Sequence, residues 1–213
     1  SRDFLINTLE KHPGISSGII ASVKDVETDL LQLIGAKIKL LQLDETTPLP
    51  FQNRYMSKGS LGYDRIAAVA GASEIYPKNN ILVINAGTCI TYDLITADNE
   101  YLGGGISPGI RMRFNSLNTF TDKLPLIEPD YGSKAELVGS DTEKSILSGV
   151  LNGVLTEVDG MIDNYKLNYQ GLKIIISGGD YKYFDRSIKN NIFATPNIVL
   201  KGLNRIHDFN EKK

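Results

Sequence analysis

The hydrophobic and polar positions in the first half of this chain alternate between the period of a helix and that of a strand. Short apolar runs, typical of buried strands, separate segments whose apolar residues recur at helical spacing. The predicted elements are, in order, a helix over 3–12, a strand over 18–23, a helix over 23–35, a strand over 37–43 and a helix that begins near Asp64. Residues 1–78 are therefore expected to form an α-β-α-β-α unit.

The second half begins with strands rather than with a helix. The predicted elements are strands over 80–85, 88–96 and 100–107, a helix over 107–118, a long helix over 141–165, a strand over 172–177, a helix over 181–190, and a strand that runs into a helix over 197–206. Ser107 followed by Pro108 is the pattern of a helix start, and Asp141 is the expected cap of the long helix. Glu143 and Glu157 are expected on the polar side of that helix.

The two halves share an α-β-α-β tail, but only the second carries a meander of strands in front of it. This asymmetry predicts a boundary between an N-terminal half, residues 1–78, and a C-terminal half, residues 79–213. A parallel ladder of only two strands buries its faces poorly, so a further β-meander is expected before Ser1 in the complete protein. The doubled layout resembles the α/β, ribonuclease-H-like fold of actin, the heat-shock 70 chaperones and sugar kinases, which implies ATP in a cleft between the halves.

The composition narrows the class of ligand. The 213 residues carry a formal charge of -2 with both signs interspersed, which provides no basic face for nucleic acid. No apolar run approaches the roughly 20 residues that span a bilayer. The single Cys89 allows no internal disulfide, and His12 and His207 lie in polar surroundings near the chain ends. A cytoplasmic protein with a small-molecule ligand or a protein partner is expected, and its acid–base chemistry falls to carboxylates.

Three glycine-containing stretches indicate places where the backbone can approach an anion. Gly87 and Thr88 fall in the turn between the first two strands of the second half, where N–H groups and a hydroxyl can hold phosphate oxygens. The run 103–105 lies close to the next predicted helix start, and Gly178 with Gly179 forms a third turn at a strand end. Each stretch also fits a plain structural turn.

Taken in order, these segments resemble the type III pantothenate kinases. The stretches that carry the resemblance are NRYMSKGSLGYDR, NAGTCITYD, GGGISPGIRMRFNSLNTFTDKLP, GSDTEKSILSG, ISGGD and LKGL. They cover almost the whole chain, and the GYDR element, the GT turn and the GGGISPG run are hard to obtain together by chance. The resemblance implies transfer of the γ-phosphoryl group of ATP to the primary hydroxyl of pantothenate, the first committed step toward coenzyme A.

The resemblance also implies roles for individual residues. Asp64 would accept the proton of that hydroxyl as general base, and Arg65 would hold the pantothenate carboxylate. Gly87 and Thr88 would contact ATP, with Mg²⁺ as the default ion for its phosphates. The positions that match substrate contacts are Tyr55, Gly62, Tyr63, Asp64, Arg65 and Thr142. A plain helix start remains the alternative for Asp64, because acidic residues in a first turn complement the helix dipole.

Two features depart from the family pattern. The phosphate loop of the first hairpin, an Asp-x-Gly-Asn-Thr element, is absent from this sequence, and a chain without it is not expected to turn over. Asn85 stands where the family usually carries an Asp that binds an activating monovalent cation such as K⁺ or NH₄⁺, so weak or absent K⁺ dependence is expected. Asp93 faces the same way as Asn85 by strand periodicity. It is a candidate to replace the missing charge, and a surface charge at a strand end is the alternative.

A homodimer is implied as well, in which the regions 107–118 and 141–165 form the interface and pantothenate lies near the subunit boundary. Met112 and Phe114 are expected to pack against the sheet. Two other functions stay open: a non-catalytic regulatory relative of the Bvg accessory factor type, and a kinase for another small alcohol. The retained GYDR element argues against the first, and the substrate-matching residues, Thr142 among them, argue against the second.

Overall fold

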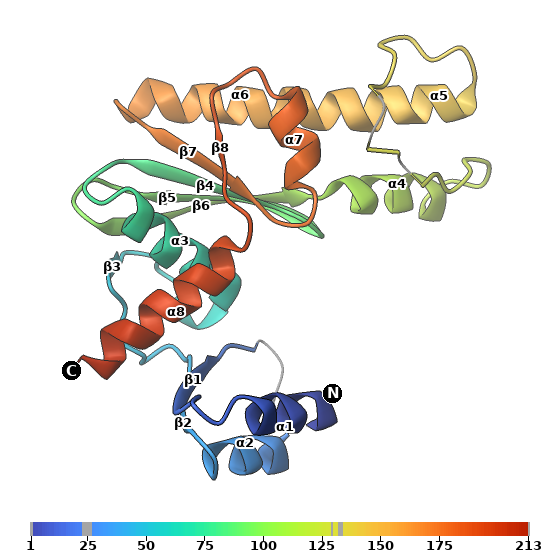
Figure 1. Cartoon of the computed structure of the whole chain (residues 1–213). Helices are drawn as coiled ribbons and strands as arrows, with labels where there is room; N and C mark the ends of the chain where they lie inside the picture. The colour runs from blue at the N-terminus through green and yellow to red at the C-terminus, as the bar shows by residue number, and fades with distance from the viewer. Residues whose placement is uncertain (1, 23–26, 129, 132–133, 213) are drawn as a thin grey trace.

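A computed structural model describes residues 2–22, 27–128, 130–131 and 134–212, and these residues form two β-sheets (Figure 1). The larger sheet has six strands in the order β3-β6-β5-β4-β7-β8, and the smaller sheet pairs β1 with β2. The strands are β1 (Ser17–Ile20), β2 (Lys39–Gln42), β3 (Gln52–Asn53), β4 (Ile81–Ala86), β5 (Cys89–Ile95), β6 (Glu100–Pro108), β7 (Lys173–Ser177) and β8 (Phe193–Ala194). The meander β4-β5-β6 is antiparallel, and β7 and β8 continue the sheet parallel to β4.

The helices pack around the larger sheet and beside the smaller one. They are α1 (Arg2–Lys11), α2 (Thr28–Gly35), α3 (Tyr63–Ile75), α4 (Ile110–Thr119), α5 (Thr142–Leu147), α6 (Gly153–Asn168), α7 (Tyr181–Ser187) and α8 (Ile198–Glu211). A π-helical stretch, Ser148–Asn152, joins α5 to α6, so the predicted long helix is continuous. Asp141 caps it as predicted, because its carboxylate accepts a hydrogen bond from Lys144 N at 2.8 Å. Among the described residues, no helix is long and apolar enough to cross a membrane.

The centre of the larger sheet is buried on both faces because β4 is apolar at successive positions. Leu82 and Ile84 point into one hydrophobic core together with α6 and α7, whereas Ile81 and Val83 point into a second core with α3 and α8. Side chains of a strand alternate between the two faces, so a run without polar interruption supplies both cores. Figure 1 shows α5, α6 and α7 above the sheet, and α3 and α8 below it.

Small residues bring α3 and α8 close together. A Cβ on Gly71 of α3 would lie 2.7 Å from the carbonyl oxygen of Ile198. Gly202 of α8 makes a similar close approach to the backbone of Ala67. The alanine-rich sequence of α3 therefore serves a tight helix–helix contact, and every residue over 65–72 is buried.

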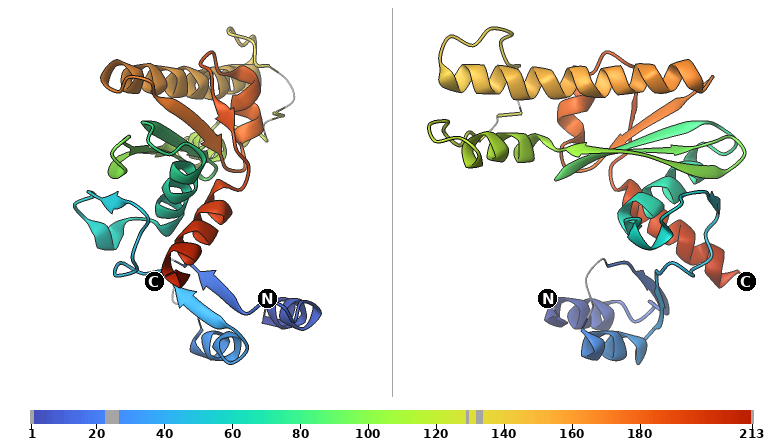
Figure 2. Two further views of the ribbon diagram at one scale, coloured as in Figure 1. Left: turned by 60° about the vertical axis from the view of Figure 1, so that its left-hand side comes forward. Right: turned by 180° about the vertical axis from the view of Figure 1, so that it is seen from behind.

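The smaller sheet belongs to a unit formed by α1, β1, α2 and β2, and both views in Figure 2 show this unit below the larger sheet. Its two strands are parallel, as predicted, and Gly18 lies opposite Leu40. Of the predicted helix 23–35, residues 23–26 lie outside the described residues. Strand β3 pairs with β6, and α3 packs on α8, so the regions on either side of residue 78 are interlocked. The proposed boundary at that residue stays a prediction.

The predicted helix start at Ser107 is wrong. Ser107 and Pro108 belong to β6, where Pro108 lies opposite Cys89, and Gly109 takes the N-cap position of α4. Pairing with β5 keeps this segment extended, although Pro is also favoured at the first position of a helix. Phe114 of α4 is buried against the sheet as predicted, whereas Met112 is 39% exposed.

The predicted strand at the start of 197–206 is also wrong. Asn197 is the N-cap of α8 and has a left-handed backbone conformation, with φ 59°. The following residues, apolar and partly β-branched, form the first turn of the helix rather than a strand. Ile198 and Val199 pack in the core that includes α3, where Ile198 is fully buried, whereas Leu200 is exposed. The strand of this region is the short β8, which lies a few residues earlier.

Candidate active site

Asp64 lies in the first turn of α3 and is exposed to solvent. Gly62 occupies the N-cap position, where it has no side chain to satisfy the free N–H groups. The Asp64 carboxylate leans over this glycine, because a Cβ on Gly62 would lie 2.5 Å from Asp64 Oδ1. Asp64 is therefore not the capping residue, and its carboxylate lies at the positive end of the helix, open to a ligand.

Arg65, the next residue, points the opposite way and enters the core between α3 and the sheet. Its Nε donates a hydrogen bond to Asp93 Oδ1 at 2.8 Å, and its Nη2 lies 2.7 Å from the same oxygen. The side chain of Arg65 is 6% exposed and that of Asp93 is fully buried. Burial lowers the pKa of Arg65, but the hydrogen bond and charge of Asp93 outweigh this effect and raise the pKa above its usual value.

Asp93 is thus the buried partner of Arg65, and the interpretation of a surface charge is wrong. Val83 lies opposite Asp93 and Asn85 lies opposite Thr91, so Asp93 and Asn85 do share one face of the sheet, as predicted. Tyr101 donates a further hydrogen bond to Asp93 Oδ1 at 2.7 Å. Burial raises the pKa of Asp93, while the hydrogen bonds and charge of Arg65 oppose this shift.

Tyr55 joins the same cluster from the loop after β3. Its ring stacks on that of Tyr101 with centroids 6.2 Å apart, and the guanidinium carbon of Arg65 lies 5.5 Å from its centroid. The ring fits because position 103 is glycine: with φ +99°, Gly103 has no side chain, and a Cβ there would lie 2.8 Å from Tyr55 Cδ2. The structure therefore brings together four of the predicted substrate residues, Tyr55, Gly62, Asp64 and Arg65. Tyr63 follows Gly62 directly and packs against the same core.

The glycine run 103–105 has a different place from the one expected. All three glycines lie within β6 rather than at a helix start. Gly104 faces the backbone of β5, where a Cβ would lie 1.6 Å from the carbonyl oxygen of Tyr92. The run therefore serves packing within the sheet and beside Tyr55, and the residue at the start of α4 is Gly109.

Three glycine segments meet at one end of the sheet. Gly109 N donates to the carbonyl of Thr88 at 3.0 Å, which joins the start of α4 to the β4–β5 turn. Asp180 N donates to the carbonyl of Ala86 at 3.0 Å, which joins the turn after β7 to the same place. Gly178, with φ +95°, leaves room for this contact, since a Cβ there would lie 2.1 Å from Ala86 O. Backbone N–H groups and a helix N-terminus gathered in this way are suited to bind an anion.

A cavity of about 320 Å³ opens beside this end of the sheet. Its wall includes Asn85 at the end of β4, the glycine pair after β7 and the first turn of α8. The positive end of α8 therefore faces the same space as the glycine turn. Pro196 and Asn197, which shape this wall, were not among the predicted site residues; the only signal for them in the sequence is a Pro-Asn pair before a helix.

Thr142 lies far from the other predicted substrate residues at the start of α3. It is the first residue of α5, and Figure 1 shows α5 above the larger sheet and α3 below it. Thr142 lines a larger cavity of about 880 Å³ between α4 and α5, which also includes Arg113, Ser116, Asp141 and Ser145. One copy of the chain does not bring Thr142 to Asp64.

A second polar cluster lies near that larger cavity and was not predicted. Glu157 of α6 accepts hydrogen bonds from Ser107 Oγ at 2.6 Å and Arg113 Nη2 at 2.6 Å, and a longer one from the Tyr92 hydroxyl at 3.3 Å. Burial raises the pKa of Glu157, but these hydrogen bonds outweigh it and leave the pKa below its usual value. Glu157 therefore points toward the sheet rather than to the polar side of its helix, whereas Glu143 is exposed as predicted.

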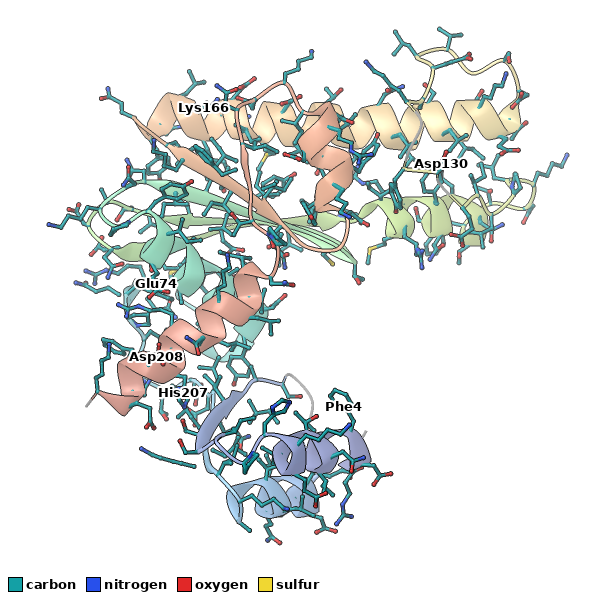
Figure 3. The ribbon with its side chains drawn as sticks, in the orientation of Figure 1. Phe4, Glu74, Asp130, Lys166, His207 and Asp208 are labelled. Atoms are coloured by element: carbon teal, nitrogen blue, oxygen red, sulfur yellow. The ribbon has the colours of Figure 1, made fainter. Side chains whose placement is uncertain are left out.

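The histidines lie elsewhere. Figure 3 shows His207 beside Asp208 on α8, and His207 Nδ1 is 3.6 Å from Asp208 Oδ1. His207 is more enclosed than its polar sequence neighbours suggest, with a side chain 12% exposed. His12 follows α1 in the smaller unit and is exposed. Both histidines therefore lie outside the lining of the cavity beside the glycine turns.

Known proteins similar to this chain identify its family. Residues 3–164 match the family described as type III pantothenate kinase. A type III pantothenate kinase of Christiangramia forsetii is 48% identical over 205 residues, 96% of this chain and 84% of the relative. The chain belongs to the type III pantothenate kinase family. A further member, from Phocaeicola vulgatus, is 43% identical over 213 residues and covers 100% of this chain and 87% of the relative.

The type III pantothenate kinase assignment agrees with the fold. A Campylobacter jejuni protein, described as a member of the Baf family of transcriptional activators, superposes with a TM-score of 0.61 at 20% identity. The match covers 89% of this chain and 82% of that protein, and at this identity it shows the fold alone. The predicted α/β fold of the ribonuclease-H-like kind and the predicted class of enzyme, a kinase, are confirmed.

Kinases typically bind ATP together with Mg²⁺. Among the described residues, no group of three or more His, Cys, Asp or Glu side chains is placed to hold a metal ion. Mg²⁺ commonly keeps several waters and binds through nucleotide phosphates with only one or two carboxylates. The geometry of the glycine turns, which is suited to bind an anion, is compatible with an ion that arrives on ATP.

Proposed function

We propose that this chain transfers the γ-phosphoryl group of ATP to the primary hydroxyl of pantothenate in the cytoplasm, the first step of coenzyme A biosynthesis. The observation that carries the proposal is the meeting of the β4–β5 turn, the start of α4 and the Gly178 turn at one end of the sheet. In a member of a kinase family, the backbone N–H groups and the helix N-terminus of three such segments in one place are suited to bind a nucleoside triphosphate.

Asp64 is the general base of the proposed reaction. The hydroxyl oxygen of pantothenate forms a bond to the γ-phosphorus, the bond from that phosphorus to the bridging oxygen breaks, and ADP leaves with the electron pair. Asp64 accepts the hydroxyl proton as the oxygen attacks. Its exposed carboxylate at the start of α3 supports this role, since phosphoryl transfer depends chiefly on positioning and charge stabilisation.

ATP binds along the glycine end of the sheet in this proposal. Gly87 N already donates to the Cys89 carbonyl at 2.9 Å, so the backbone N–H and the hydroxyl of Thr88 contact phosphate oxygens, and Gly87 allows their close approach. The first turn of α8 contributes its positive end. Mg²⁺ bound to the phosphates neutralises charge that develops during transfer. In the part of the chain that the structure describes, nothing lies within 4 Å of the Cβ position of Gly87, which supports close approach of a ligand there.

Pantothenate binds beside Asp64, in contact with Tyr55, Gly62, Tyr63 and Arg65. The clustering of these residues around the start of α3 supports the assignment. Arg65 is the cationic group nearest in sequence to the base, and most of its guanidinium faces Asp93 and Tyr55. The edge that remains is proposed to donate to pantothenate, with the carboxylate as its natural acceptor.

Thr142 acts across a homodimer in this proposal. Because α5 and α3 lie on opposite faces of the sheet, Thr142 can reach the pantothenate bound beside Asp64 only from a second copy of the chain. Exposed apolar side chains near the larger cavity, Phe120, Leu137 and Val138, support an interface there. Mixing Asp64→Asn with Thr142→Ala subunits tests this: activity above that of either variant alone is expected, and its absence contradicts a shared site.

The function is tested by ATP-dependent phosphorylation of pantothenate by the full-length gene product. Asp64→Asn should abolish turnover while leaving the protein folded. Asp29→Asn is a matched control, since Asp29 is also an exposed acidic residue in the first turn of a helix, in the smaller unit. No activity from the folded wild-type protein would point instead to a regulatory relative, and activity on another alcohol but not on pantothenate would point to a different kinase.

A further inference from the structure

The contacts between Arg65 and Asp93 all involve one carboxylate oxygen, Asp93 Oδ1. Asp93 Oδ1 receives Arg65 Nε at 2.8 Å and the Tyr101 hydroxyl at 2.7 Å, and Arg65 Nη2 also lies 2.7 Å from it. Within the described residues, Asp93 Oδ2 is buried and accepts no hydrogen bond. The position of the Arg65 guanidinium therefore depends on a single carboxylate oxygen, whose own place is set by β5 and by Tyr101.

This oxygen is connected to the candidate site on two sides. Along α3, Arg65 directly follows Asp64, so holding the Arg65 side chain against the sheet limits rotation of the first helical turn. Across the sheet, Tyr101 bonds to Asp93 and stacks with Tyr55, whose ring also faces Arg65. Two predicted pantothenate contacts, Tyr55 and Arg65, are thus held by Asp93 and Tyr101, which were not predicted to belong to the pantothenate site.

A gain in folding stability is by itself a weak explanation for burying the Arg65–Asp93 ion pair. Burial of two charges costs desolvation free energy, and apolar residues of similar volume are often equally stabilising or more so. A buried pair does, however, hold a long flexible side chain in one orientation with charge-assisted hydrogen bonds. That property matters where a reacting group lies on the same helical turn.

We propose that Asp93 is a positioning residue of the pantothenate site: through Oδ1 it holds Arg65, and with Tyr101 it sets the places of Tyr55 and of the turn that carries Asp64. This rests on the proposed function, because it concerns the same site. Asp93 itself touches no substrate and acts through Arg65.

The test compares Asp93→Asn with the wild-type protein in two measurements: equilibrium binding of pantothenate and of ATP by calorimetry, and the steady-state constants for each substrate. A misplaced contact group can cost about a hundredfold in rate. We expect pantothenate affinity and kcat/KM for pantothenate to fall about tenfold to a hundredfold, with ATP affinity unchanged. Wild-type affinity for pantothenate and normal turnover in a folded Asp93→Asn protein would overturn the proposal.

Asp93→Asn leaves the buried Arg65 without a counter-charge and can fail to fold, so a second variant is needed. Tyr101→Phe removes only the hydroxyl that donates to Asp93 Oδ1 and keeps the ring beside Tyr55. A smaller loss in the same direction is expected, and unchanged pantothenate binding would overturn the proposal even if Asp93→Asn does not fold.

Glu100→Gln is the matched control. Glu100 is adjacent to Tyr101 and pairs with Arg54 at 2.5 Å, but that pair lies at the surface, with side chains 30% and 57% exposed. The Glu100→Gln variant should therefore leave pantothenate affinity unchanged. A purely structural role of Asp93 would lower the unfolding temperature without altering pantothenate affinity per folded molecule. If the wild-type protein itself neither binds nor phosphorylates pantothenate, the proposed function fails instead, and the two failures are distinguishable.

Discussion

Gly202 of α8 lies against the backbone of Ala67 in α3, and a Cβ on Gly202 would lie 1.6 Å from the Ala67 carbonyl oxygen. No side chain fits there without separating the helices. Since α3 carries Asp64 at its start and α8 forms part of the wall of the smaller cavity, this contact links the proposed base to the proposed nucleotide site.

Gly202→Ala should therefore destabilise the protein strongly. Inserting a methyl group into a packed contact typically costs about 1–3 kcal/mol, and occasionally more where backbone must move. Gly160→Ala in α6 is the control, because no atom of the described residues lies within 4 Å of its Cβ position. An alanine in a helix interior is favoured over glycine by about 1 kcal/mol, so this variant should be slightly more stable. Thermal and urea unfolding measure both; equal stability of the two variants would contradict the close contact.

Gly87→Ala separates ligand binding from folding. Nothing in the described protein lies within 4 Å of the Cβ position of Gly87, so its unfolding temperature should not change. If ATP phosphates approach that position, the methyl group should weaken ATP binding by about tenfold, or about 1.4 kcal/mol. Gly178→Ala, by contrast, should lose stability, because of its left-handed backbone and its contact with Ala86. Calorimetric titration with ATP checks the first variant, and unimpaired binding would place the phosphates elsewhere.

Glu157→Gln should show a pH-dependent loss of stability. The folded pKa of Glu157 is lowered, with burial opposed and outweighed by the hydrogen bonds of Ser107 and Arg113. A lowered carboxyl pKa contributes stability above the unfolded value, about 4.3, and this contribution is lost as the pH falls through the folded value. At pH 7 the variant should be less stable by about 1 kcal/mol. The difference should shrink below the unfolded pKa of about 4.3 and close once the pH is below the lowered folded pKa. Urea unfolding at several pH values checks it, and a difference that persists in acid would argue against an ionic role.

Asn85 should make the enzyme weakly dependent on K⁺ or independent of it. Asp93 shares the face of Asn85 but is already paired with Arg65, so it does not offer a free charge. A unit charge pair at 4 Å contributes about 4 kcal/mol at an effective dielectric near 20, before desolvation is subtracted. Rates in K⁺ and in a bulky organic cation should thus be similar for the wild-type protein, whereas Asn85→Asp should gain activation. Strong K⁺ activation of the wild-type protein would contradict this.

Much of the second half of the fold follows from local pattern. The apolar runs of β4, β5, β6 and β7, the cap at Asp141 and the continuous helix after it were all predicted, because strand period and helix caps are properties of neighbouring residues. The errors lie where tertiary pairing competes with local preference. Pro108 is held in a strand by Cys89 across the ladder, and the residues after Asn197 form a helix that covers α3.

The candidate site residues were also predicted from local sequence motifs, but the side chains with which they pair were not. Asp64, Arg65, Gly87 and Gly178 stand in short motifs that the chain carries contiguously. The partner of Arg65 is 28 positions away, and Glu157 lies 50 positions from Ser107. Nothing in the spacing of such residues indicates which of several carboxylates a given arginine meets.

The amino-acid sequence by itself determined most of the order of strands and helices, the glycine turns and the family, since these depend on contiguous residues and their spacing. Only the tertiary structure decided that three of the glycine segments meet at one end of the sheet, that Arg65 turns inward to Asp93, and that Thr142 lies on the opposite face from Asp64. Such relations arise from strand register and helix packing, which bring distant segments together according to the shape of the whole core.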